Sequence, residues 1–300
     1  MLVLTRAEVE DLLDLDALVE ALASAHAELS AGRASVPPRV AAFSERGLLG
    51  AMPGFVHGAG LGAKLVSLFP QNRAPLPTHQ AAIALFDEET GAFTAIMDGT
   101  YITAVRTAAT AALAMRLLAR ADARVLAVLG TGVQSRAAQE IFPRVRAFAE
   151  VRVAGRGEFE AAVRGADVVH AATHSADPVV LAGWLSPGVH VSSVGYNAPG
   201  SELDEENVAN ADVVCVESRE SALAPAPAGA PELAGVDPEA VVELGELVSA
   251  TRPGRTSAED MTLYKSVGVA VQDLAAAALV VRAAKERGVG REIELEEVPA

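Results

Sequence analysis

The sequence predicts an α/β protein in which a doubly wound parallel sheet is combined with a second domain of mixed α and β structure. Three observations predict this class. The chain has 300 residues, which suits two domains better than one. From residue 124 to residue 216, short apolar stretches alternate with helical or loop segments, as in a parallel sheet covered by helices. Residues 39–110 instead carry strand signals in succession, which is typical of a mixed sheet.

The first helix is expected at the N-terminus. Thr5 and Glu8 have the spacing of a capping box, in which each side chain accepts from the other residue's backbone N–H. Leucines and valines then recur at helical spacing as far as Leu22, which predicts one amphipathic helix. An Ala-rich helix is expected over residues 104–119 and a final helix over residues 266–286.

Between the first two helices, strands are expected at residues 48–52, 62–69, 81–86 and 93–97. The turn residues between the last two predict a hairpin. Residues 124–129 then form an apolar run of the kind expected for a strand buried on both faces. A glycine-rich turn and a helix to about residue 141 follow, and further strands are expected at residues 150–154, 168–172, 189–194 and 213–216.

The glycine-rich turn reads Gly130-Thr131-Gly132-Val133-Gln134-Ser135 between a strand and a helix, which is the context of a dinucleotide fingerprint. Gly130 would permit the tight turn, and Gly132 would let backbone N–H groups approach a pyrophosphate. Ser135 stands where a third glycine is usual, and a plain turn in an unrelated α/β fold is the alternative. The motif therefore predicts a Rossmann-type sheet that binds NAD or NADP.

The end of the next strand indicates which dinucleotide is preferred. An acid at this point would accept bonds from the ribose of NAD, but the strand ends Val153-Ala154-Gly155-Arg156. A guanidinium suits the 2′-phosphate of NADP. NADPH is therefore the expected cofactor, with NADH possible if Arg156 is solvated and Glu158 or Glu160 binds the ribose.

Two cations stand in apolar surroundings in the first half of the chain. Lys64, one of only three lysines, lies in a predicted strand, and Arg106 lies in an Ala-rich predicted helix. A buried cation without a partner is costly. The residues alone leave two partners open, a ligand carboxylate or the acids of the protein itself.

These residues belong to a longer pattern that resembles the ornithine cyclodeaminase/mu-crystallin family. The pattern comprises Ala63-Lys64, Phe69-Pro70, Pro77-Thr78-His79-Gln80, Leu85-Phe86-Asp87, Met97-Asp98-Gly99, Arg106-Thr107-Ala108-Ala109, the glycine-rich turn, Gly165-Ala166-Asp167-Val168-Val169, Pro187-Gly188, the stretch from Val194 to Asp204 and Lys265-Ser266-Val267-Gly268. The resemblance implies a homodimer with a mixed α+β substrate and dimerisation domain, residues 1–118 with 265–300. It places the dinucleotide-binding Rossmann domain at residues 119–264.

The resemblance also implies roles for individual residues. Arg39, Lys64 and Arg106 match positions that hold the substrate carboxylate. The expected cofactor-binding residues are Gly130, Thr131, Gly132, Val133, Gln134, Arg156, Thr107, Thr173, Gly195 and Lys265. A structural role is equally open for Lys265. The expected catalytic residues are Lys64, Asn197 and His79.

One departure from the family pattern indicates the reaction. Cyclodeaminase and alanine dehydrogenase members have an Asp two residues before the Pro-Gly turn, where this chain has Asn197. An amide cannot remove a proton from an ammonium substrate, but reduction of a protonated imine needs no such base. We therefore expect reduction of a cyclic ketimine carboxylate, Δ1-pyrroline-2-carboxylate or Δ1-piperideine-2-carboxylate, to L-proline or L-pipecolate. The alternatives are ornithine cyclodeaminase, an alanine dehydrogenase-like activity and a non-catalytic NADP-binding protein.

His79 could relay protons in such a reaction, but a buried core position is the favoured interpretation. The formal net charge of −15 argues against nucleic acid and anionic membranes as partners. Neither a signal peptide nor a membrane-spanning run is evident, so a cytoplasmic location is expected. No metal site is expected, and Cys215, in an apolar run, is expected to be a buried strand residue.

Overall fold

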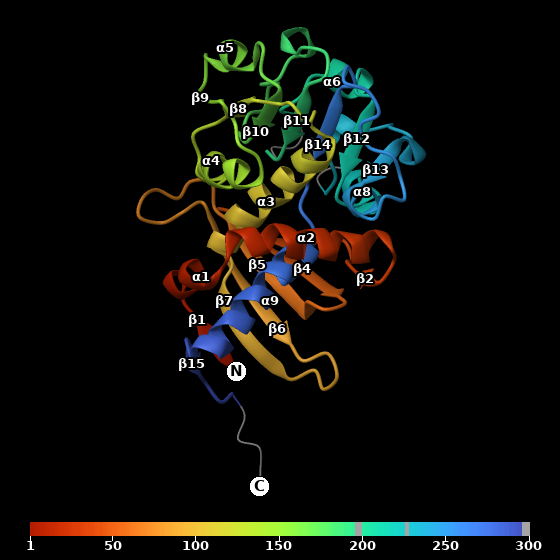
Figure 1. The fold of residues 1–300 in the computed structure, drawn as a ribbon. Helices are drawn as coiled ribbons and strands as arrows, with labels where there is room; N and C mark the ends of the chain where they lie inside the picture. The colour runs from red at the N-terminus through yellow and green to blue at the C-terminus, as the bar shows by residue number, and fades with distance from the viewer. Residues whose placement is uncertain (196–199, 226–227, 296–300) are drawn as a thin grey trace. The chain divides into compact units, whose positions relative to one another are not determined.

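The structure is a computed structural model that describes residues 1–195, 200–225 and 228–295 (Figure 1). The chain divides into two units, residues 1–106 with 269–300 and residues 107–268. Helix α3 (Thr100–Leu118) contains the boundary, so Arg106 belongs to the first unit and Thr107 to the second.

The first unit contains two N-terminal helices, an antiparallel meander and a C-terminal helix. The helices are α1 (Arg6–Leu12), α2 (Leu15–Ser30) and α9 (Ala270–Arg287). The strands are β1 (Leu2–Leu4), β2 (Ala34–Ser35), β3 (Val40–Phe43), β4 (Leu48–Val56), β5 (Gly60–Leu68), β6 (His79–Phe86), β7 (Phe93–Asp98) and β15 (Arg291–Glu292). They form one sheet in the order β15-β1-β7-β6-β5-β4-β2, with β3 also paired to β4.

The N-terminal capping box is confirmed. The Thr5 hydroxyl accepts from the Glu8 N–H at 3.4 Å, and the Glu8 carboxylate accepts from the Thr5 N–H at 2.7 Å. The prediction of one helix as far as Leu22 is wrong, because α1 ends and Asp14 begins a second helix. The Asp14 carboxylate caps α2 by accepting from the N–H groups of Asp16 and Ala17.

One face of this sheet is covered by helices (Figure 1). Helices α2 and α9 pack together, with α9 against strands β4, β5 and β6 and α2 against β4. A Cβ at Gly54 would lie 2.9 Å from that of Ala270, so the missing side chain allows α9 close to β4. The residues on this face are buried, among them Met52, Ile83 and Met97.

The other face of the sheet is apolar as well, but more exposed. Leu49 on β4 and Leu61 and Leu65 on β5 are 51%, 38% and 42% exposed, and Val40 on β3 is 64% exposed. The strand register places these four side chains on the same face, opposite to Met52. Exposed apolar patches of this kind mark interaction surfaces in soluble proteins.

The second unit contains a wholly parallel sheet in the order β13-β12-β14-β11-β10-β8-β9. Its strands are β8 (Val125–Leu129), β9 (Glu150–Ala154), β10 (Val168–Ala171), β11 (His190–Ser193), β12 (Val213–Val216), β13 (Val241–Glu243) and β14 (Thr262–Lys265). The α-helices after α3 are α4 (Val133–Val145), α5 (Phe159–Val163), α6 (Glu205–Ala209), α7 (Arg219–Ala222) and α8 (Leu244–Val248), with short 3-10 turns at Ala182–Trp184, Pro231–Leu233 and Pro238–Ala240. The predicted α/β class is confirmed.

Strand β14 was not expected from the sequence, although it lies between β11 and β12 and is fully buried. Its residues Thr262, Tyr264 and Lys265 interrupt the apolar pattern of a buried strand. The Thr262 hydroxyl donates to the Leu118 carbonyl at 3.1 Å, so its polar group is satisfied inside the protein. Local hydrophobicity could not reveal this strand, because its burial depends on such long-range partners.

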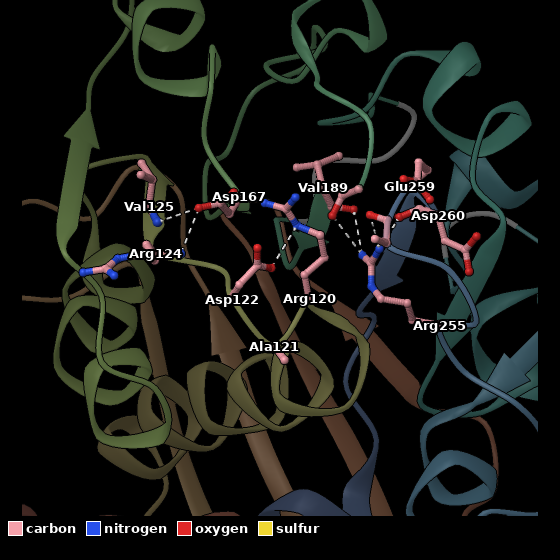
Figure 2. A network of polar contacts seen from close by, with 12 residues as sticks. Arg120, Ala121, Asp122, Arg124, Val125, Asp167, Val189, Arg255, Glu259 and Asp260 are labelled. Atoms are coloured by element: carbon pink, nitrogen blue, oxygen red, sulfur yellow. Dashed lines mark hydrogen bonds and ion pairs between the residues drawn. The ribbon is translucent and has the colours of Figure 1, made fainter.

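A polar network ties together the amino-terminal edge of this sheet (Figure 2). Asp167 stands just before β10 and accepts from two backbone N–H groups just before and at the start of β8, that of Arg124 at 2.8 Å and that of Val125 at 2.9 Å. Its carboxylate also forms an ion pair with Arg120. Arg255 donates to the carbonyls of Leu118, Gly188 and Asp260, among others. Backbone carbonyls at the strand and helix ends of this edge are thereby satisfied.

Among the residues that the structure describes, no helix has the length and the apolar character needed to cross a membrane.

Candidate active site

The turn after β8 has the backbone geometry that a dinucleotide-binding turn requires. Gly130 has a φ of +117°, and a Cβ there would lie 2.4 Å from the Ala172 carbonyl oxygen. Gly132 is the N-cap of α4, no side chain caps this helix end, and the space beside Gly132 is open. The first N–H groups of α4 and the helix dipole therefore suit a pyrophosphate. Ser135, in place of the third glycine, is buried and accommodated.

This turn lies at a switch point of the parallel sheet. Strand β8 pairs with β9 on one side and with β10 on the other, so the chain reverses its direction of winding there. Ligands of open α/β sheets bind at the carboxyl ends of the strands beside such a point. Gly130 follows β8 and Thr173 closely follows β10, so the structure brings these two expected cofactor residues to the same edge.

The end of β9 presents both a cation and an acid. Arg156 and Glu158 are exposed, and the Glu158 carboxylate accepts from the Gly155 N–H at 3.3 Å. A Cβ built on Gly155 would lie within 4 Å of both the Glu158 carboxylate and the Thr131 side chain. The acid expected for NAD and the cation expected for NADP thus belong to the same short turn.

A buried acid that sequence reasoning missed organises the carboxyl ends of β10 and β11. Glu202 is 2% exposed. One carboxylate oxygen accepts from the Thr173 N–H and hydroxyl, both at 2.6 Å. The other oxygen accepts from the Ser193 hydroxyl at 2.8 Å and the Gly195 N–H at 2.7 Å. Glu202 therefore fixes the backbone at two expected cofactor residues, Thr173 and Gly195.

Lys265, at the end of β14, is buried and bound by the protein. Its ammonium lies 2.9 Å from a carboxylate oxygen of Glu232 and donates to the Ser193 hydroxyl at 3.0 Å and the Gly195 carbonyl at 2.9 Å. Glu217 accepts from the N–H groups of the turn that follows Lys265. These contacts favour the structural role for Lys265 over direct cofactor binding.

The first unit holds the second cluster of expected site residues. Lys64 on β5 and Arg106 on α3 are 2% and 5% exposed, and both contact Asp273 of α9. The Lys64 ammonium lies 2.8 Å from one Asp273 oxygen, and the Arg106 Nε donates to the other at 3.1 Å. Of the two kinds of partner that the sequence left open, the protein therefore supplies an acid of its own.

The charge state of Lys64 reflects this setting. The pKa of Lys64 is lowered to about 8, first by burial and then by the charges of Arg106 and Arg39, while the Asp273 carboxylate acts in the opposite direction. The ammonium form therefore prevails at neutral pH and is lost as the pH rises above about 8. The cluster thus joins two buried cations, Lys64 and Arg106, to one internal acid, Asp273.

Gln272, beside Asp273, also holds Arg106. Its side-chain oxygen accepts from an Arg106 terminal nitrogen at 2.6 Å, and its nitrogen lies 3.2 Å from His26 Nε2. His26 and Gln272 are fully buried. Two of the three Arg106 nitrogens are thus oriented by α9.

Three other expected site residues have different outcomes. His79 is exposed at the start of β6, so its interpretation as a buried core residue is wrong; the apolar pattern of β6 begins two residues later. Arg39 is also exposed, and its positive charge contributes to the lowered pKa of Lys64. Asn197 lies outside the described residues. The catalytic or binding roles expected for these residues stay predictions.

Sequence reasoning missed Asp273, Gln272, Glu202 and Glu232. The first two form the only polar pair between Ser266 and Arg282, in an otherwise apolar or Gly-containing stretch. Polar residues on a buried helix face need partners, so this pair was a usable signal. Glu202 and Glu232 lie in loop sequences where acids are common, and no local pattern distinguished them.

Comparison with known proteins agrees with this geometry. The sequence is 38% identical over 257 residues to the ketimine reductase mu-crystallin of Mus musculus, covering 78% of this chain and 80% of that protein. The structure of the Thermococcus litoralis Δ(1)-pyrroline-2-carboxylate reductase in complex with NADH and L-proline is similar, with a TM-score of 0.89, 32% identity and coverage of 98% and 100% of the two chains. An archaeal alanine dehydrogenase dimer with bound NAD has a TM-score of 0.90, 32% identity and coverage of 99% of each chain.

The family comparison gives the same result over most of the chain. The sequence matches the family description over residues 1–161 and 154–288, which together span both units. The motifs that carry the resemblance, from Lys64 to the Lys265 turn, fall within these ranges. This chain belongs to the ornithine cyclodeaminase/mu-crystallin family.

Proposed function

We propose that the protein is an NAD(P)H-dependent oxidoreductase that reduces a cyclic ketimine carboxylate, Δ1-pyrroline-2-carboxylate or Δ1-piperideine-2-carboxylate, to L-proline or L-pipecolate. The observation that carries the proposal is the buried pair Lys64 and Arg106, which meet at Asp273. Relatives named ketimine reductase and Δ(1)-pyrroline-2-carboxylate reductase support the substrate class, and one similar structure contains NADH and L-proline.

Residues of the first unit would bind the substrate, and residues of the second unit would bind the cofactor. Lys64 and Arg106, with Arg39, would bind the substrate carboxylate, and in this way hold the imine carbon in one orientation. Gly130 to Gln134 and the first turn of α4 would hold the pyrophosphate. The bound nicotinamide supplies the hydride. Residues 1–118 with 265–300 would thus serve as the substrate domain and residues 119–264 as the cofactor domain.

The amide at position 197 supports reduction over deamination. Asn197 can orient an iminium nitrogen by a hydrogen bond, but it cannot take a proton from an ammonium at useful pH. Substrates that arrive as a protonated imine need no base before hydride addition. His79, which is exposed on β6, is the candidate to return protons from solvent.

For the cofactor, we propose a preference for NADPH, with Arg156 binding the 2′-phosphate. Its exposed guanidinium at the end of β9 supports this preference. Glu158 in the same turn is the competing group, because a carboxylate would favour the ribose of NADH. Relatives with bound NADH or NAD show that this family also uses the unphosphorylated cofactor.

We further propose that the protein is a homodimer, in which the exposed apolar face of the first unit's sheet covers the same face of a second copy. Leu49, Leu61 and Leu65 on that face support the proposal. A related alanine dehydrogenase is a dimer.

The test is an assay of the purified protein with each cyclic imine and with NADPH or NADH, followed by nicotinamide absorbance. We expect turnover, and more with NADPH. Ammonia release from L-ornithine would instead identify a cyclodeaminase, and pyruvate formation from L-alanine an alanine dehydrogenase. Cofactor binding with no turnover of any of these substrates would contradict the proposed enzymatic activity. It would identify the protein as a non-catalytic dinucleotide-binding protein.

A further inference from the structure

Asp273 occupies a central position between the two cations of the first unit. Its Oδ2 lies 2.8 Å from the Lys64 ammonium, and its Oδ1 accepts from the Arg106 Nε at 3.1 Å. The Asp273 side chain is only 1% exposed. Strand β5, helix α3 and helix α9 each contribute one residue, so three separate elements meet at this carboxylate.

We propose that Asp273 is a positioning residue of the carboxylate site, which holds Lys64 charged and Arg106 oriented so that together they bind the substrate carboxylate. The inference rests on the function proposed above. This role needs no contact between Asp273 and the substrate, because each Asp273 oxygen faces one of the two cations.

The charges explain why such a residue is needed. Two buried cations repel each other, and burial by itself favours the neutral amine of Lys64. With Asp273 the trio carries one net positive charge, since two cations are offset by one anion. Without Asp273, loss of the Lys64 proton would relieve the repulsion, and Arg106 would remain as the one charged donor to a carboxylate, with no ammonium beside it.

Asp273 lies at a helix end that suits a carboxylate. It belongs to the first turn of α9, where the helix dipole stabilises a negative charge. Gln272 fixes the same guanidinium from the neighbouring position at 2.6 Å. Contacts within the protein therefore fix the positions of both Lys64 and Arg106.

The proposal predicts how ligand binding depends on pH. The charged groups that act on Lys64 are Asp273 on α9, Arg106 on α3 and Arg39. Only Asp273 favours the ammonium. Carboxylate affinity should therefore hold at neutral pH and fall as the pH rises through the pKa of Lys64, and this fall should begin at lower pH when Asp273 is neutralised.

The first experiment measures Lys64 directly. The chain has only three lysines, so ¹³C labelling of the lysine ε-carbons gives three NMR signals, and Lys64→Arg assigns the one of interest. In Asp273→Asn we expect the pKa of Lys64 to fall by about 1–3 pH units. In Asp273→Glu, which keeps the charge, it should remain near the wild-type value.

The second experiment measures binding of pyrrole-2-carboxylate to the full-length protein by calorimetry across the pH range. Its aromatic ring accepts no hydride and its nitrogen does not titrate, so binding is measured without turnover and without a change in the charge of the ring. At neutral pH, Asp273→Asn should weaken binding roughly 10- to 100-fold, and Asp273→Glu should restore part of the loss. Asp167→Asn is the matched control, because Asp167 pairs with Arg120 in the second unit.

The outcomes separate this inference from the proposed function. If Asp273→Asn changes neither the Lys64 pKa nor ligand binding and only lowers thermal stability, as Asp167→Asn should, the inference is overturned. If wild type reduces no cyclic imine but Asp273→Asn still shifts both readouts, the proposed function fails and the positioning role stands. If the Asn variant does not fold, the wild-type titrations decide: a carboxylate affinity that does not fall as Lys64 loses its proton would overturn the inference.

Discussion

Lys64 and Arg106 are the residues on which the proposed chemistry depends most directly. Each is buried, and each retains Asp273 as a partner if the other is replaced. A methionine at either position keeps much of the apolar stem and removes the charge. The effect of such a change should therefore appear in substrate binding before it appears in folding.

We expect Lys64→Met and Arg106→Met each to raise KM for the imino acid strongly while cofactor affinity changes little. Removing one partner of a desolvated carboxylate costs about 2–5 kcal/mol. Steady-state kinetics measures the effect, and Lys285→Met, which changes an exposed lysine near the end of α9, is the control. An unchanged KM in either variant would show that the residue has a structural role only.

Arg156 is the residue that should decide between the two cofactors. A charge-assisted hydrogen bond to the 2′-phosphate is worth about 1.5–3 kcal/mol, or roughly 10- to 150-fold in preference for NADPH. Arg156→Ala should remove most of that preference, as the ratio of kcat/KM for the two cofactors will show.

Arg164→Ala is the control for Arg156, because Arg164 is also exposed but pairs with Glu160 on α5. It should leave the ratio unchanged. Equal or better kcat/KM of the wild type with NADH would contradict the assignment and favour ribose binding by Glu158.

At the scale of single elements, strands β10 and β11 each contain one buried histidine. His170 and His190 are fully buried, and their Nδ1 atoms lie 2.8 Å from the Ser192 hydroxyl and 3.0 Å from the Thr262 hydroxyl of the neighbouring strands. Burial lowers the pKa of each to about 3 from the ordinary 6.5. Between pH 6.5 and about 3, both histidines are therefore neutral in the folded protein, whereas the same side chains become protonated in the unfolded chain.

This difference predicts acid sensitivity of the second unit. Above pH 6.5 neither state binds these protons, and as the pH falls from 6.5 towards 3 only the unfolded chain does. The free energy of unfolding should then decline by about 1.4 kcal/mol per pH unit for each histidine. Urea unfolding at several pH values measures it through the fluorescence of Trp184, the single tryptophan, which lies in this unit.

A variant isolates the contribution of one histidine. His170→Asn keeps a polar group near Ser192 but does not titrate, so the slope of unfolding free energy against pH should fall by about half between pH 5 and 6.5. His57→Asn, which changes an exposed histidine of the first unit, is the control. An equal slope in wild type and His170→Asn would show that His170 is protonated in the folded state.

At the scale of the whole molecule, the two faces of the first unit's sheet differ in what covers them. Helices α2 and α9 pack against one face, whereas the other exposes Leu49, Leu61 and Leu65. Full burial of a leucine side chain is worth about 1.5–3 kcal/mol, so a few such residues weigh heavily in association. The proposed homodimer would bury them.

Leu49→Lys and Leu61→Lys should each weaken this dimer, because each places a charge where an apolar contact is expected. Analytical ultracentrifugation over a range of concentrations should show dissociation of the variants at concentrations where wild type is dimeric. Val151→Lys is the control, since Val151 is 42% exposed on β9 of the second unit. A monomeric wild type, or variants as dimeric as wild type, would exclude this face as the interface.

Local patterns in the sequence determined much of this protein. The run from Val125 to Leu129 predicted β8, and Gly130 and Gly132 predicted the turn after it, because strand burial and turn geometry depend on adjacent residues. Thr5 and Glu8 predicted the first helix start for the same reason. The family followed from motifs distributed over most of the chain.

Only the tertiary structure decided which distant groups meet. Arg106 and Asp273 are 167 residues apart in sequence and form an ion pair, and β14 enters the sheet between β11 and β12. His79 proved to be exposed although an apolar stretch follows it. The physical reason is shared: a polar group is buried at low cost only where another element supplies its partner, and a local pattern does not contain that partner.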